Sequence, residues 1–445
     1  MKCSKQQNRS RREFLRVAAG GAALGPFFLF RRLPRAGEST LKIVRWSHFL
    51  PEYDRWFEKE FVKAWSIRQN THVTIDTVPV EKIAAVAAAE VAGKHEHDLY
   101  MFPWPPAEYR RHAIDHTEVY MMVAARHGNL NRIAHKSTLD PATKKYFAFA
   151  DSWMPTPFHY LEDCWSEVGI PFGPGHYDGL KSGAKRIREK RGIPCGLALG
   201  CNLEGNITLH TLLSAFHSQV LNANNNVAIN NYRTIVALRY VKDLATNAGT
   251  PSEVAWQPAE NVKAMLAGKT SCTMNAINLV RSAEEANPLT ARRIMIAPPL
   301  VGVAGSMAIP FVTSCSLIWN WAQNKEGAKQ FLSDFVDEFG VAYDRSRGCS
   351  FPVFQNTVPN LIRRLESDPA ADPPYKYTRL NDALHWTPNL GFPGYANPIS
   401  MEAFNTFVIP RMFLSVVKGQ ATPEDAARTA AAEVKRISEK WRQVG

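Results

Sequence analysis

Aromatic, amide and acidic side chains follow several predicted strands of the chain, at the point where each strand ends. His48 follows the first predicted strand, Trp104 follows the third, and Asn275 follows a strand in the second half of the chain. Because ligands of open α/β sheets bind beyond the carboxyl ends of the strands, we expect these side chains to line a cleft. Indole faces that cover C–H groups, together with amides and carboxylates that bond hydroxyls, suit a sugar.

The same rule selects further positions, some of which have a second interpretation. Glu204 bonds the solute or only caps the helix that follows it, and Trp104 lines the cleft or serves as a lid or surface residue. Trp153, at a predicted crossover between two lobes, is expected to contact the ligand, whereas the loop position of Trp386 fits contact and packing equally. The predicted ligand-binding residues are Trp46, His48, Trp104, Trp153, Asn202, Glu204, Asn275, Asn278 and Trp386.

The sequence carries no common catalytic motif. It contains no H-E-x-x-H, P-loop, G-x-S-x-G or Rossmann glycine pattern. The one metal-like cluster, His95-Glu96-His97-Asp98, falls in a predicted solvated turn, so we predict neither a metal nor any other cofactor. We therefore predict a binding protein that is not an enzyme.

Two other functions remain open at this point. The first is a periplasmic carbohydrate-active hydrolase that uses Glu204 with Asp151, which would need the two carboxyls about 5–9.5 Å apart. The second is a receptor for a charged solute such as a polyamine or an organic acid, with Glu204 or Asp151 facing a cation.

The first 37 residues predict an export signal. The hexad Ser10-Arg11-Arg12-Glu13-Phe14-Leu15 is a twin-arginine pattern, and the apolar stretch 17–30 is too short for a membrane span of about 20 residues. Residues 1–37 carry a net +8 of the chain's +12, so the remaining +4 is an ordinary surface charge and nucleic-acid binding is not expected. We predict export to the periplasm by the twin-arginine route; a basic anchoring segment is the alternative.

Six cysteines follow this segment, and six thiols allow fifteen complete pairings. No C-x-x-C is present, and buried free thiols are as consistent with the pattern as a disulfide. Cys195 and Cys201 are the closest pair in the sequence and the first that we would test.

Short apolar runs alternate with helical patterns from residue 41 onward, which is typical of an α/β protein, and 445 residues suggest two lobes. A crossover between lobes is predicted over 146–160, and the segment 366–400 is predicted to be extended loop. The predicted strands are 41–46, 73–78, 98–102, 195–201 and 270–274. The predicted helices are 52–69, 81–93, 232–246, 325–339 and 423–441.

Several ordered motifs resemble one family. The segment 321–332 contains Asn-Lys-Glu-Gly-Ala-Lys-Gln-Phe-Leu, which resembles an "N-K-E-x-A-x-x-F-L" helix start, and 418–427 resembles "G-x-x-T-P-E-E-A". The segment 160–170 resembles "Y-N-K-D" in part, because Leu161 and Glu162 replace its Asn and Lys. These motifs make the chain similar to the family 1 extracellular solute-binding proteins of ABC importers, the group that includes maltose-binding protein.

The resemblance implies a two-lobe periplasmic binding protein fold of type II, with a ligand cleft between lobes joined by hinge crossovers. Lobe 1 is expected over 38–151 with 306–348, and lobe 2 over 152–305 with 349–445. Such a protein binds a small polar solute, here a sugar or oligosaccharide, by hinge closure. Its expected partners are the solute, the membrane permease subunits of an ABC transporter and the Tat export machinery, and it is expected to be a monomer.

Overall fold

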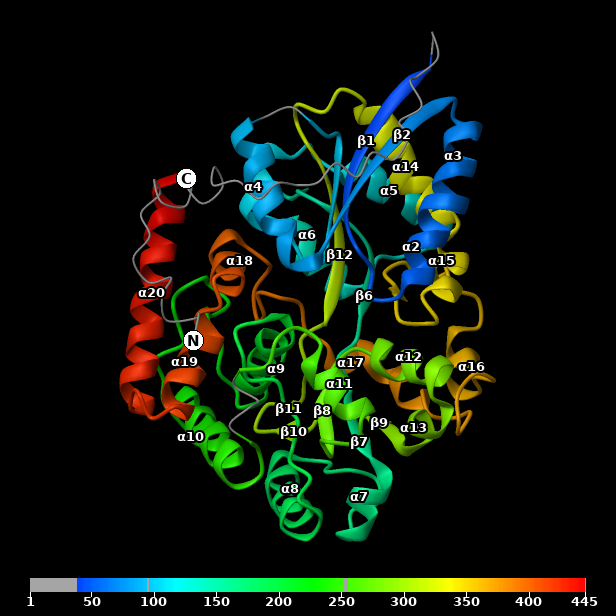
Figure 1. Ribbon diagram of the computed structural model, residues 1–445. Coiled ribbons are helices and arrows are strands. Elements are labelled where there is room, and N and C mark those ends of the chain that lie inside the picture. The colour runs from blue at the N-terminus through cyan, green and yellow to red at the C-terminus, as the bar shows by residue number, and fades with distance from the viewer. Residues whose placement is uncertain (1–37, 94–95, 251–254, 445) are drawn as a thin grey trace, which may run out of the picture.

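The computed structural model of the protein describes residues 38–93, 96–250 and 255–444. The predicted export signal and His95 of the metal-like cluster lie outside the described residues. The described residues form two α/β lobes, each built around its own sheet (Figure 1). No helix within these ranges is long and apolar enough to cross a bilayer.

The first lobe contains a mixed six-stranded sheet with the strand order β13-β6-β12-β3-β1-β2. β1 pairs in parallel with β2 and β3, and β12 pairs antiparallel with β3 and β6. The parallel strands β1 to β3 therefore present their carboxyl ends at one edge, which faces the second lobe in Figure 1. The strands are β1 (Ser39–Trp46), β2 (Thr71–Val78), β3 (Leu99–Phe102), β6 (Phe149–Met154), β12 (Val312–Ile318) and β13 (Phe351–Pro352).

Helices cover both faces of this sheet, with α4 on one side and α2, α3 and α14 on the other (Figure 1). Aromatic residues at helical spacing explain the packing: Phe57 and Phe61 meet Phe331 and Phe335 edge-on, with ring centroids 5.4–6.1 Å apart. The helices are α2 (Pro51–Trp56), α3 (Val62–Arg68), α4 (Ile83–Gly93), α5 (Thr117–His127), α6 (Arg132–Thr138), α14 (Lys325–Asp337) and α15 (Phe339–Arg345). A π-helical turn (Phe57–Phe61) joins α2 to α3, so the predicted helix 52–69 is continuous but not uniformly α-helical.

The second lobe contains an antiparallel three-stranded sheet, β8-β7-β9, surrounded by most of the remaining helices. Its strands are β7 (Phe158–Leu161), β8 (Cys272–Met274) and β9 (Ile294–Ala297), and a hairpin of β10 (Val301–Gly302) and β11 (Gly305–Ser306) follows. Its helices are α7 (Glu162–Glu167), α8 (Tyr177–Arg191), α9 (Leu203–Ala215), α10 (Tyr232–Asn247), α11 (Glu260–Leu266), α12 (Asn278–Ala286) and α13 (Pro288–Arg293). The carboxyl-terminal part adds α16 (Leu361–Glu366), α17 (Ala383–Trp386), α18 (Pro398–Asn405), α19 (Val408–Val417) and α20 (Pro423–Val444).

The chain passes between the lobes at three places, two of which lie on neighbouring strands. β6 belongs to the first sheet and β7 to the second, and only residues 155–157 separate them. The chain returns along 307–311 into β12, which pairs with β6, and it leaves again beyond 353–356, which follow β13 and bond residues 127–131 of the first lobe. The predicted crossover within 146–160 is therefore confirmed.

Two predictions of local structure are wrong. Residues 195–201 form no strand, although the backbone N–H of Gly196 donates to the carbonyl of Cys272 at 2.9 Å. The segment 366–400 is not loop throughout, since it contains α17 and the start of α18. Asn397 caps α18 and Pro398 follows at its first position, a start signal that the many prolines of this segment obscured.

Candidate functional site

His48 follows β1 and is held in one orientation by its neighbours. Its backbone N–H donates to the carboxylate of Asp54 at 3.1 Å, and its Nδ1 accepts the N–H of Leu50 at 3.1 Å. Nε2–H is then the remaining donor of the neutral ring, and it has no partner among the described residues. Burial, followed by the charge of Arg45, lowers the pKa of His48 to about 3, so the ring is neutral at physiological pH.

A small cavity of about 20 Å³ lies beside His48 inside the first lobe and has room for one water molecule. Asp151 lines it and accepts the hydroxyls of Ser152 and Ser314 at 2.6 and 3.2 Å. Burial raises the pKa of Asp151 to about 7. Trp46 also lines this cavity and is buried. The structure thus places Trp46 and His48 in the polar interior of this lobe, and solute contact by either remains a prediction.

Trp104 follows β3 and lies where the lobes meet. Its half-buried ring faces Phe404 of α18, with centroids 5.8 Å apart. Phe49, after β1, similarly meets Phe311 at the second crossing segment, 307–311, with ring centroids 5.6 Å apart. Aromatic residues that follow β1 and β3 therefore meet aromatic partners on the way to the second lobe.

The start of α9 brings an amide and a carboxylate to the second lobe's side of this boundary. Asn202 caps the helix, since its Oδ1 accepts the N–H of Gly205 at 2.8 Å and its Nδ2 donates to the carbonyl of Trp256 at 2.8 Å. Glu204 accepts the N–H of Ala259 at 2.9 Å through Oε1, and its buried Oε2 has no partner among the described residues. Both polar atoms of the Asn202 side chain therefore have partners within the protein, whereas one carboxylate oxygen of Glu204 does not.

Burial raises the pKa of Glu204, and the charge of Glu81 adds to the shift. Glu81 lies on the 3-10 turn Val80–Lys82 that follows β2, so it belongs to the first lobe. The charge of Glu81 therefore acts on Glu204 from the other lobe.

Three more predicted residues present unpartnered polar atoms. Asn275, directly after β8, bonds its own neighbour through Oδ1 but leaves its buried Nδ2 without a partner in the described chain. Asn278 begins α12 and has an unpartnered Oδ1, and Trp386 ends α17 and has an unpartnered Nε1. The carbonyl of Trp386 accepts the N–H of Ala308 at 3.1 Å, which places Trp386 beside a crossing segment.

Trp153 does not share a pocket with the other predicted contacts. Its side chain is 1% exposed, its Nε1 donates to the carbonyl of Pro352 at 3.3 Å, and its ring packs 5.5 Å from Phe351. The cavity of about 400 Å³ that it lines, with Phe354 and Leu380, includes none of the other predicted contacts. Packing across β6 and β13 thus accounts for this indole without a ligand.

Glu204 Oε2 and Asn278 Oδ1 are open acceptors, and Asn275 Nδ2 and Trp386 Nε1 are open donors. A buried polar atom without a partner is costly, so such atoms mark positions where a polar ligand or water bonds. A hydroxyl both donates and accepts, so it can pair with either kind of atom. The set includes one acid and no base.

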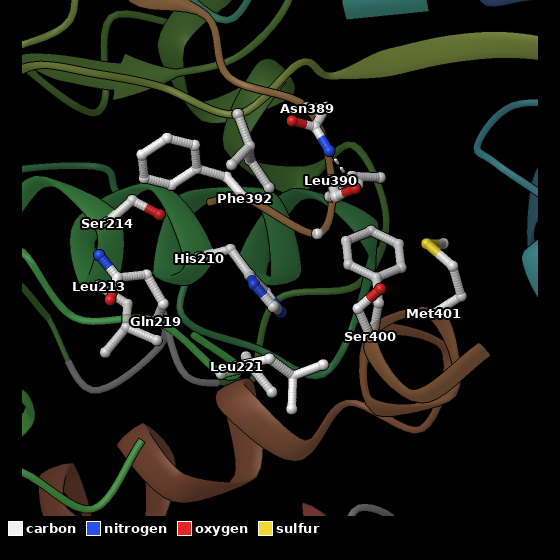
Figure 2. A pocket seen from close by; sticks show the side chains of 14 residues that line it. His210, Leu213, Ser214, Gln219, Leu221, Asn389, Leu390, Phe392, Ser400 and Met401 are labelled. Atoms are coloured by element: carbon white, nitrogen blue, oxygen red, sulfur yellow. Dashed lines mark hydrogen bonds between the residues drawn. The ribbon is translucent and has the colours of Figure 1, made fainter. Parts of the chain in front are cut away.

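A third cavity, of about 40 Å³, lies between α9, the loop 389–392 and α18 (Figure 2). His210 points into it in Figure 2, and the buried Nε2 of this residue has no partner among the described residues. Burial lowers the pKa of His210 to about 4. Phe404 contacts both His210, at 5.4 Å, and Trp104, so this cavity adjoins the boundary between the lobes. Sequence analysis missed it because residues up to 400 were predicted to be loop.

The metal-like cluster is an ion-pair network in the structure. His97 Nδ1 lies 2.9 Å from Glu90, and His97 Nε2 lies 2.9 Å from Asp76. Although burial opposes the charge, hydrogen bonds to Asp76 and Glu90 raise the pKa of His97 to about 9. Glu90, Glu96 and His97 lie close enough together to hold an ion, and both ring nitrogens of His97 already bond carboxylates.

The comparisons with known proteins establish the fold. No protein-family model and no curated protein matches the sequence. Among solved structures, maltose-bound MalE3 of T. maritima aligns with a TM-score of 0.73 at 17% identity, over 90% of this chain and 100% of that one. A solute-binding protein of an ABC transporter from Thermotoga lettingae TMO, bound to α-D-tagatose, aligns with a TM-score of 0.74 at 16% identity, over 90% and 100%.

A sugar transporter protein from Arthrobacter chlorophenolicus A6 with bound laminaribiose aligns with a TM-score of 0.75 at 13% identity, over 90% of this chain and 99% of that chain. These likenesses confirm the predicted two-lobe periplasmic binding protein fold. At such low identity they establish the arrangement of the chain and not its ligand.

Proposed function

We propose that this protein is a periplasmic receptor that closes its two lobes around a small sugar or oligosaccharide and delivers it to the permease of an ABC transporter. The observation that carries the proposal is the set of buried, unpartnered donors and acceptors on Glu204, Asn275, Asn278 and Trp386. The aromatic contact of Trp104 with Phe404 lies at the same boundary and supplies apolar faces for sugar C–H groups.

The similar solved structures support this proposal, because those proteins bind maltose, α-D-tagatose and laminaribiose on the same fold. We further propose that the lobes are the two sheets with their covering helices, and that the chain acts as a monomer. Export by the twin-arginine route and location in the periplasm belong to the same proposal and rest on the sequence of residues 1–37.

We propose that the protein is not an enzyme. Asp151 lines the small cavity inside the first lobe and bonds Ser152 and Ser314, whereas Glu204 bonds Ala259 in the second lobe and does not line that cavity. The carboxylate pair that a glycosidase requires is therefore not supported by the surroundings of these two residues.

A thermal-shift screen of monosaccharides, oligosaccharides, polyols and polyamines tests the proposal. A sugar that raises the melting temperature should also reduce the radius of gyration in solution scattering and should be recovered unchanged after incubation. Stabilisation by polyamines alone would assign the site to a cation held by Glu204 and Glu81. Turnover of a chromogenic glycoside that is lost in Glu204→Gln would contradict the receptor proposal and indicate a hydrolase.

A further inference from the structure

Two buried thiols lie side by side in the second lobe. Cys195 and Cys272 are both buried free thiols, and their Sγ atoms are 3.6 Å apart although 77 positions separate them in the sequence. Cys195 is therefore not bonded to Cys201, the partner that sequence proximity suggested first. The remaining described free cysteines, Cys164, Cys315 and Cys349, are also buried.

The backbone holds the two thiol-bearing segments together. The N–H of Gly196 donates to the carbonyl of Cys272 at 2.9 Å, and the N–H of Ser271 donates to the carbonyl of Pro194 at 2.8 Å. A disulfide requires the sulfurs to be about 2.05 Å apart, so they need to approach by about 1.5 Å. Rotation of the two side chains within these adjacent segments can provide most of that movement.

We propose that Cys195 and Cys272 form an intramolecular disulfide when the protein meets a disulfide oxidant. A thiolate of one cysteine attacks the oxidant's S–S bond and releases one thiol, and the second cysteine then attacks the mixed disulfide and releases the other. The pair loses two electrons and two protons, and the oxidant is reduced to two thiols.

The bond would join the two segments that lead into the proposed site. The segment from Cys195 runs on to the cap of α9 and Glu204, and β8, which begins at Cys272, ends directly before Asn275. The hydrogen bond between the thiols, together with burial, raises the pKa of Cys195 well above its ordinary value. The thiolate is therefore scarce in the native state, which slows its reaction with the oxidant.

The test is incubation of the full purified chain with oxidised glutathione, followed by unfolding in an alkylating agent and peptide mass spectrometry. We expect a cross-linked peptide pair that contains Cys195 and Cys272, two fewer alkylated thiols than in the untreated chain, and a higher melting temperature after oxidation. Cys272→Ser should lose the cross-link, and Cys315→Ser, a matched change at another buried thiol, should keep it.

The proposal is overturned if both thiols remain alkylatable after prolonged oxidation under mildly destabilising urea. Persistent glutathione adducts without the bridge, or a bridge from Cys195 to any other cysteine, would overturn it equally. If Cys272→Ser fails to fold, Cys195→Ala provides the same comparison from the other side. None of these readouts depends on the identity of the solute.

Discussion

The polar residues behind the edge of the first sheet and those facing it from the second lobe differ in the partners that hold them. In the first lobe, Arg45 pairs with Asp54, and Asp54 also accepts the backbone N–H of His48. In the second lobe, Glu204 and Asn275 each bond the local backbone with one atom and leave the other open. The ion pair makes the first group a fixed platform, whereas the second group is held by neutral backbone groups. Nε2 of His48 is also without a partner among the described residues, so an open polar atom alone does not distinguish a binding site from a structural network.

The largest expected effect would come from breaking the platform with Arg45→Met. Arg45 is 3% exposed, its guanidinium lies 2.5 Å from Asp54 and it stacks 4.5 Å above the ring of Phe57. Removal of one partner leaves a partly buried carboxylate without its counter-charge, so we expect a loss of about 3 kcal/mol in the free energy of unfolding measured with urea.

Arg345→Met is the matched control for this prediction. Arg345 pairs with Glu60 at 3.1 Å on the surface, with both side chains about half exposed, so its loss should cost less than about 1 kcal/mol. Equal losses in the two variants would mean that the Arg45 network is no more than a surface pair.

The open groups of the second lobe can be tested with Glu204→Gln. The change retains an acceptor for the N–H of Ala259 but removes the charge that strengthens a hydrogen bond to a solute. A hydrogen bond to a charged group contributes about 1.5–3 kcal/mol, so sugar affinity measured by calorimetry should fall about ten- to a hundredfold.

Stability should not fall in Glu204→Gln, because burial disfavours the charged form of this carboxyl. Glu189→Gln, on the exposed surface of α8, should leave both quantities unchanged. A loss of stability with unaltered affinity would mean that Glu204 has a structural role and does not contact the solute.

Trp153→Phe separates packing from ligand contact at the crossover. The variant loses the Nε1 hydrogen bond to Pro352 and part of the packing against Phe351. We expect about 1–2 kcal/mol less stability and an unchanged sugar affinity. An affinity loss of tenfold or more in a variant that stays folded would support the predicted direct contact between Trp153 and the solute.

The smallest expected effect concerns His97, which lies away from both regions. The folded-state pKa of His97, about 9, lies above the ordinary value of 6.5, so its pairing stabilises the fold fully below pH 6.5. This stabilisation is lost as the pH rises through about 9. Because Asp76 is half exposed, we expect only about 1 kcal/mol after solvent screening.

His97→Gln should remove that pH-dependent component from urea titrations between pH 6.5 and pH 10. His385→Gln, at a histidine that is 86% exposed, should retain the wild-type profile. A wild-type slope that persists in His97→Gln would assign the pH dependence to another group.

Periodicity and strand-end rules predicted the parts of the fold that depend on local pattern. The aromatic spacing that buries Phe57 and Phe61 identified the first helix, and the break in the apolar run near Asp151 identified the crossover. The same rules failed at 195–201, where an apolar segment makes too few backbone hydrogen bonds to form a strand.

Sequence rules selected the candidate site residues by their positions after strands or at helix starts, but they did not predict which polar atoms of these residues have hydrogen-bond partners. Glu204, Asn275 and Asn278 were selected because they follow strands or begin helices, and the structure leaves polar atoms of all three open. Asn202 met the same criterion, but both ends of its amide are used by Gly205 and Trp256. Whether such a side chain has all its hydrogen bonds depends on partners that are distant in the sequence, and a local sequence pattern does not show which residues these are.

The placement of β6 and β12 side by side has a mechanical consequence. Neighbouring strands are about 4.8 Å apart, so the connections 155–157 and 307–311, which adjoin the paired ends of these two strands, leave the first sheet close together. Two tethers held side by side favour pivoting of the lobes about them over sliding. A probe pair placed on α4 and α8 would follow such a pivoting motion directly.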